Sequence, residues 1–195
     1  PVQSATLNQS IPANLRDPGN RWFGLTSRAR VIFYNKATVN PAALSTYEDL
    51  ADPKWQGRIC VRSSNSIYNQ SLLASMIATK GTAQAETWAK GLVANLARPP
   101  SGGDRDQIKA VASGQCDIAI ANTYYYAQML YGGDAAQKAA ANKVSLFWPN
   151  QRDRGTHINI SGAGVTASAK NKANAVKLLE YMVLDDAQRW YATTN

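Results

Sequence analysis

The sequence predicts an α/β fold, with a parallel-type sheet flanked by helices. Short apolar runs typical of buried strands alternate along the chain with segments of helical periodicity, and turn-forming residues separate them. The 195 residues are 45% apolar and 17% charged, which indicates a packed core and argues against disorder. The length suits one large domain or parts of two.

Four strands are expected from apolar or β-branched runs between turn residues. They cover residues 30–35, 57–62, 116–121 and 144–148, and short extended pieces are expected over 155–166. A capping-box pattern at 45–48 predicts a short helix that ends before Pro53. Further helices are expected up to Gly81, over 82–96, from Asp104 to 114, from the tyrosines to Gly132, and near the end of the chain. Loops with at most one short helix are expected over 1–20.

The charge balance sets limits on the partners. Lys and Arg number 21 against 13 acidic residues, for a net charge of +8, but the basic residues are spread without a run of five. This spacing favours a solvated surface, so no nucleic-acid partner is expected. No apolar stretch approaches the length of a membrane span. Because the chain starts without Met or a signal sequence, we expect it to begin at an internal or processed position.

The residues that usually carry catalysis are sparse. Two cysteines and one histidine do not make a zinc site. Cys60 and Cys116 both fall in expected strands, where they could be two buried thiols or a disulfide. His157 is expected to be a structural, hydrogen-bonded histidine. No serine has a neighbouring His and Asp arrangement, and no other nucleophile or acid–base pair stands out, so an enzyme is not expected.

Tyrosines follow two of the expected strands. Tyr124, Tyr125 and Tyr126 come after the run 116–121 through a polar Asn-Thr step, and Tyr68 has the equivalent position after the run 57–62. In a parallel sheet, ligands collect beyond the carboxyl ends of the strands. If the two strands are neighbours, the phenols of residues 68, 124 and 125 converge at one edge, where the dipoles of two helices favour phenolate. The alternative is that they are half-buried packing residues with wet hydroxyl groups.

Converging phenols suit a hard, highly charged cation. A tyrosine has an ordinary pKa of about 10, so its deprotonation at neutral pH requires a strong cation or a very positive site. Hard trivalent iron prefers anionic oxygen ligands, and three phenolates offset its 3+ charge. The pattern therefore indicates Fe(III), although the spacing by itself is suggestive and not specific.

Five segments carry a resemblance to a known family. They are residues 22–31, 44–58, 65–71, 117–126 and 155–164, and they are spread over most of the chain. The chain resembles the ferric-iron-binding periplasmic proteins, which are the solute-binding components of iron(III) ABC importers. It is most similar to the cyanobacterial-type subgroup with a tyrosine-rich site. The Asn-x-Tyr-Tyr element after a strand is specific to this iron branch.

The resemblance implies a type II periplasmic-binding-protein-like fold and roles for particular residues. Tyr124 and Tyr125 match the paired iron ligands of the family, and Tyr68 matches the additional tyrosine of the subgroup. Arg28 matches an arginine that lies beside the metal in some members and balances phenolate charge. Tyr126 aligns just past the ligand pair and is expected to pack. Arg105, in the turn-like Gly-Gly-Asp-Arg element at 102–105, is a candidate anion-binding residue.

The resemblance also predicts how the chain is divided. Residues 1–27 are expected to be a remnant of the amino-terminal lobe and hinge, and residues 28–150 the carboxy-terminal lobe with the tyrosine site. Residues 151–195 are expected to be the hinge return and amino-terminal-lobe helices. Family members extend beyond this chain at both ends, and their further His or Tyr ligand near the mature start has no match here.

The function implied is capture of ferric ion in the periplasm and its delivery to an ABC permease in the inner membrane, by a monomer. A synergistic anion can accompany the ion. The alternative is a related ABC solute-binding protein for a small organic anion, with Arg28 and Arg105 as charge partners and the tyrosines as walls.

Overall fold

The computed structural model describes residues 1–194 and divides the chain into two compact units. One unit combines Pro1–Arg28 with Ile160–Asn195, and the other is Ala29–Asn159. The division falls within two strands, β1 (Phe23–Asn35) and β5 (Ile158–Ala163).

The larger unit is built on a mixed sheet. Its strands run in the order β2-β3-β1-β4, where β2 is Ile59–Cys60, β3 is Ile118–Asn122 and β4 is Val144–Phe147, and β5 pairs with β1 off this path. Strands β2 and β3 are parallel, but β1 is antiparallel to both β3 and β4. The α/β class is confirmed, whereas the expected parallel arrangement holds only for β2 and β3. Alternating strands and helices show that crossovers exist but do not fix the direction in which each strand re-enters the sheet.

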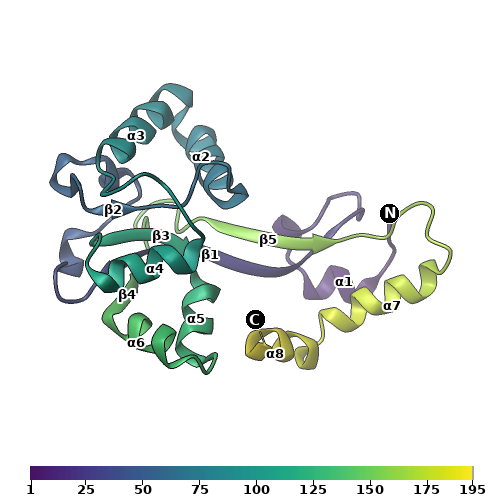
Figure 1. The fold of residues 1–195 in the computed structure, drawn as a ribbon. Helices are drawn as coiled ribbons and strands as arrows, with labels where there is room; N and C mark the ends of the chain where they lie inside the picture. The colour runs from purple at the N-terminus through teal and green to yellow at the C-terminus, as the bar shows by residue number, and fades with distance from the viewer. Residues whose placement is uncertain (195) are drawn as a thin grey trace. The chain divides into compact units, whose positions relative to one another are not determined.

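Helices cover both faces of this sheet (Figure 1). One face carries α2 (Ile67–Lys80) and α3 (Thr82–Ala94), and the other carries α4 (Asp104–Ser113), α5 (Thr123–Tyr131) and α6 (Ala135–Lys143). Successive strand residues point to opposite faces, as pleated geometry requires. Ile32, Ile118 and Ile120 therefore pack in the α2/α3 core, and Val31 and Phe33 in the other core.

The predicted strands and helices agree with the structure at most positions, with differences at their bounds. The strand expected at 30–35 begins earlier, at Phe23, while the one expected at 57–62 is reduced to Ile59–Cys60. The capping-box segment forms 3₁₀ turns, Glu48–Ala51 and Pro53–Trp55, with Thr46 Oγ1 accepting from the Asp49 N–H. Two other short 3₁₀ turns are Ala13–Leu15 and Pro41–Ala43.

Helix α6 was not expected. Its segment is rich in alanine and buries little apolar surface, since Ala141 is its one fully buried side chain among the described residues. The pattern therefore lacks the apolar periodicity from which helices are usually predicted. Its start is nevertheless marked, because the Asp134 carboxylate accepts from the N–H groups of Ala136 and Gln137.

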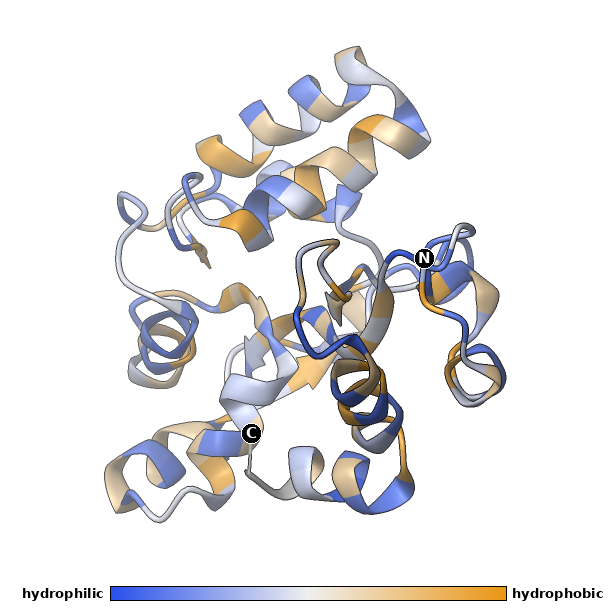
Figure 2. Ribbon diagram, turned by 90° about the vertical axis from the view of Figure 1, so that its right-hand side faces the viewer, coloured by the Kyte–Doolittle hydropathy of each residue, from blue (hydrophilic) through white to orange (hydrophobic). Residues whose placement is uncertain are grey.

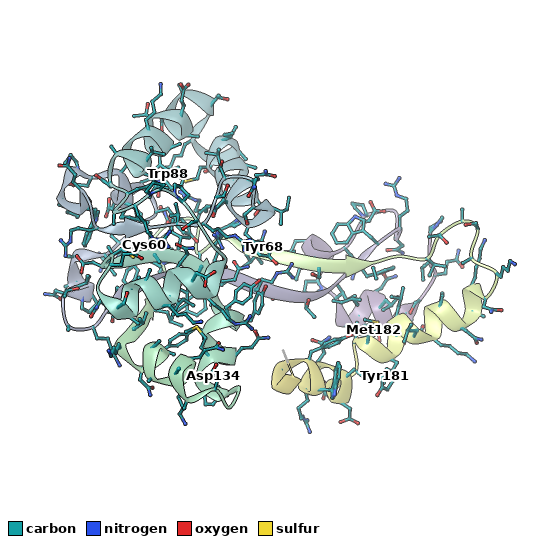
Figure 3. All side chains as sticks on the ribbon, in the orientation of Figure 1. Cys60, Tyr68, Trp88, Asp134, Tyr181 and Met182 are labelled. Carbon is teal, nitrogen blue, oxygen red and sulfur yellow. A yellow bond between two sulfur atoms is a disulfide. The ribbon has the colours of Figure 1, made fainter. Side chains whose placement is uncertain are left out.

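The two cysteines form a disulfide, which decides between the two alternatives left open by the sequence. Cys60, which is labelled in Figure 3, ends β2, and Cys116 precedes β3. Their Cα atoms lie 5.9 Å apart. Both residues are buried in the core that faces α4 and α5. The link therefore joins the two strands that lead to the tyrosines.

The smaller unit has its own apolar cluster. Helices α1 (Ala5–Ser10), α7 (Lys172–Met182) and α8 (Asp185–Thr194) belong to it. Leu7, Phe23 and Leu179 are buried together in the cluster. Ser4 caps α1 by accepting from the Leu7 N–H, and it donates to Glu180.

None of the helices within the described residues is long and apolar enough to cross a bilayer. Helices α2 and α3 of the larger unit are the two uppermost helices in Figure 2. Apolar and hydrophilic residues alternate along them, as on amphipathic helices that cover a core.

Candidate metal centre

The three candidate ligands lie at the starts of two helices that follow parallel strands. Tyr68 is the second residue of α2, and Tyr124 and Tyr125 are the second and third residues of α5. Because β2 and β3 are parallel neighbours, their carboxyl ends meet at one edge of the sheet. The two strands are therefore neighbours, as convergence of the phenols requires.

The phenols are close enough to touch. The hydroxyl oxygens of Tyr68 and Tyr124 are 3.3 Å apart, although the two residues are 56 positions apart in the chain. The rings of Tyr124 and Tyr125 have centroids 4.0 Å apart and are tilted by 33°. All three side chains are half-buried. Figure 3 shows Tyr68 where α2 begins.

The environment of Tyr124 disfavours its ionisation without a cation. Burial, and then the neighbouring hydroxyls of Tyr125 and Tyr68, raise the pKa of Tyr124 well above its usual value of 10.0. Burial is the largest of these effects on the pKa of Tyr124. Phenolate at this position therefore requires a strong positive charge beside it.

Three arginines lie against the tyrosine rings. The Arg105 guanidinium is 5.2 Å from the Tyr125 centroid and donates to Gln128 one turn along α5. The guanidinium groups of Arg30 and Arg62 lie 5.8 and 5.7 Å from the Tyr68 centroid. Arg105 was a candidate from the sequence, but Arg30 and Arg62 were missed. Arg30 begins a predicted strand, and a sequence does not show which distant residues face such a side chain.

Other predicted residues lie as follows. Arg28 ends the first segment of the smaller unit, where it donates to Ser161 Oγ at 2.6 Å, and its role beside a metal stays a prediction.

Tyr126 packs on Phe33, with centroids 5.3 Å apart, and donates to the Val144 carbonyl, so the expected packing role is confirmed. His157 Nε2 lies 3.1 Å from Ser71 Oγ, which agrees with a structural, hydrogen-bonded histidine.

The conventional metal-binding side chains do not form a site of their own. In the part of the chain that the structure describes, no group of three or more His, Cys, Asp or Glu residues is placed to hold a metal ion.

Comparisons with known proteins agree with the resemblance seen in the sequence. The chain is 52% identical over 195 residues to iron uptake protein A1 of Synechocystis sp., covering 100% of this chain and 54% of that relative. It is 29% identical to the Fe(3+)-binding periplasmic protein of Serratia marcescens, of which it covers 56%. The chain thus spans about half the length of the curated relatives it matches.

A solved structure extends the likeness to the fold. The Trichodesmium protein IdiA, or FutA, in complex with iron and citrate ligands superposes with a TM-score of 0.94 at 57% identity, over 97% of this chain and 60% of that one. Apo FutA2 from Synechocystis superposes with a TM-score of 0.93 at 52% identity. The family model for bacterial extracellular solute-binding proteins matches residues 1–195. The chain therefore belongs to the bacterial extracellular solute-binding protein family.

Proposed function

We propose that the protein binds ferric iron in the periplasm through Tyr68, Tyr124 and Tyr125 and delivers it to an ABC importer of the inner membrane. The observation that carries this proposal is the 3.3 Å contact between the hydroxyl oxygens of Tyr68 and Tyr124, with Tyr125 stacked beside them. The names of the relatives, which include an iron uptake protein and an Fe(3+)-binding periplasmic protein, support the choice of ion.

The spacing of the phenol oxygens suits a shared ion. In an octahedral site with metal–oxygen distances of about 2.0–2.1 Å, as for Mg²⁺, adjacent ligand oxygens are about 2.9 Å apart. The separation of 3.3 Å between the Tyr68 and Tyr124 oxygens needs only a small adjustment to reach this value. Three phenolates would balance the 3+ charge, so the ion could be held in a half-buried site.

The same chemistry provides a route for release. Each tyrosine loses a proton when it binds the ion, so protons compete with iron for the site. Reduction weakens binding as well, because Fe(II) is a softer ion with a lower charge and pairs less well with phenolate. Release to the importer can therefore follow either protonation or reduction.

An absorption spectrum tests the proposal. Phenolate–Fe(III) charge transfer should give a red to orange colour when the protein is loaded with ferric citrate, and Tyr124→Phe should abolish or strongly weaken the band. Tyr131→Phe is the matched control, since Tyr131 lies on the same helix and its side chain is 86% exposed. A colourless loaded protein, or a Tyr124→Phe variant with the full band, would count against the tyrosine site.

The three arginines near the rings support a second candidate function, which is binding of a small organic anion. The guanidinium groups of Arg30, Arg62 and Arg105 all lie within 6 Å of a tyrosine ring. Calorimetry separates the candidates: iron binding should release protons in proportion to the tyrosines bound, whereas anion binding should not. Heat from iron-free citrate, unchanged in Tyr124→Phe, would favour the anion.

A further inference from the structure

A buried ion pair lies directly behind the tyrosines. Arg30 and Asp104 are 0% and 1% exposed, and their Nη1 and Oδ2 atoms are 3.1 Å apart. The other carboxylate oxygen of Asp104 accepts from Arg62 at 3.1 Å. Two guanidinium groups and one carboxylate give this group of side chains a net charge of +1. Both guanidinium groups face the ring of Tyr68.

The Arg30 guanidinium connects both tyrosine-bearing helices. Its Nη2 donates to Asn69 Oδ1, and Asn69 follows Tyr68 directly on α2. Its Nη1 donates to Asn122 Oδ1 at 3.1 Å, and Asn122 ends β3 two residues before Tyr124. One planar, rigid fork therefore spans the gap between the start of α2 and the start of α5.

Asp104 completes the connection. Its carboxylate accepts from Arg30 at Oδ2 and from Arg62 at Oδ1, and Oδ2 also accepts from the backbone N–H of Asn122 at 2.8 Å. Asp104 is also the first residue of α4, and the next residue, Arg105, packs on the Tyr125 ring. We call Arg30, Arg62, Asn69, Asp104 and Asn122 the Arg30 cluster.

Fold stability alone is a poor reason to keep such a cluster. A buried ion pair can often be replaced by well-packed apolar residues without loss of stability. Among the described residues, Arg30 Nε and Asn122 Nδ2 are buried without a hydrogen-bond partner, which adds a further cost. Buried polar groups of this kind are common behind metal ligands, where they hold the ligands in position.

We propose that Arg30 is a positioning residue of the tyrosine site, and that its bonds to Asn69, Asp104 and Asn122 set the distance between Tyr68 and the Tyr124–Tyr125 pair. This inference rests on the proposed ferric-ion function. The net positive charge of the cluster also offsets part of the negative charge of the three phenolates.

Two variants test the positioning role, and both leave the net charge of the cluster at +1. Asn69→Ser cuts the bond from Arg30 to α2 while every charge stays in place. Arg30→Met with Asp104→Leu removes both charges of the fully buried pair, and Arg62, which loses its bond to Asp104, has a side chain that is 25% exposed to solvent. The matched control is Arg58→Met with Asp117→Leu, an ion pair of 2.6 Å that precedes β2 and β3 and so lies at the other end of the same two strands.

Each variant of the full-length protein is loaded with ferric citrate and followed by absorption, iron affinity and far-UV circular dichroism. Removal of groups behind metal ligands costs about 10–100-fold in metal affinity. We expect weaker binding of that order and a shifted charge-transfer band in the Arg30 and Asp104 variant, a smaller loss in Asn69→Ser, and wild-type behaviour in the control pair.

The outcomes are distinguishable. If the wild-type protein shows no charge-transfer band, the proposed function itself fails. If the wild type shows the band and Asn69→Ser keeps its position and the full affinity, the positioning role is overturned, even where the double variant does not fold. Equal loss in the control pair would also overturn it, because a general loss of stability would then explain the effect.

Discussion

Loss of the Cys60–Cys116 disulfide should lower the free energy of unfolding of the larger unit by about 4 kcal/mol. The bond closes a loop with a sequence separation of 56. In the chain-entropy treatment, such a loop removes about 14 cal/mol/K from the unfolded ensemble, or about 4 kcal/mol at 25 °C. For a protein of this size, the change corresponds to a decrease of roughly 8–16 °C in Tm.

Two perturbations separate the covalent link from packing. Cys60→Ala with Cys116→Ala removes the bond and two buried sulfur atoms, whereas reduction of the wild-type protein removes the bond alone. Urea denaturation followed by circular dichroism gives the free energy for each, and a thiol assay in denaturant should find no free thiol before reduction and two after it. An unchanged midpoint and slope in the reduced protein would refute the entropic reasoning.

Three further predictions concern pH and the core. Iron affinity should fall steeply as the pH falls, because burial and neighbouring phenols hold the pKa of Tyr124 above its usual value and each bound tyrosine must lose a proton; a dissociation constant that does not change between pH 8 and pH 6 would contradict this. Burial, followed by Arg30 and Arg154, lowers the pKa of His157 below 6.5. The unfolded chain then binds more protons, so stability should decrease as the pH falls below about 6.5, and His157→Gln should flatten the profile from denaturant titrations. Phe33→Ala should cost about 3–5 kcal/mol, since the ring is fully buried, while Tyr131→Ala at an exposed position should change the free energy of unfolding by less than about 0.5 kcal/mol.

Local chemistry made the helices that carry the site predictable. Gly81, with a φ of 82°, and Gly114, with a φ of 78°, end α2 and α4 where a helix must turn out of its regular path. The apolar run before Asn122 identified β3, and equivalent positions after two strands identified Tyr68 and Tyr124. These features depend on neighbouring residues, which a sequence shows directly.

Strand directions and the residues behind the site could not be predicted in the same way. The register that places Arg30 opposite Asn122 is set by antiparallel pairing of segments 92 residues apart. The ion pair with Asp104 likewise spans 74 positions. Such pairings depend on the packing of both sheet faces at once, and nothing in the pattern around Arg30 distinguishes a buried charge from the polar start of a strand.

The parallel pairing of β2 with β3 matters more to the candidate site than the rest of the sheet. It brings the carboxyl ends of β2 and β3 to one edge. The Arg58–Asp117 ion pair fastens the same two strands at the opposite end, and the disulfide links the last residue of β2 to Cys116, just before β3. The Arg30 cluster fastens them at the tyrosine end. If these fastenings act independently, reduction of the disulfide should lower stability and leave the iron absorption band unchanged, whereas Asn69→Ser should shift the band. A band lost on reduction would show that the disulfide and the tyrosine end of the strand pair are coupled.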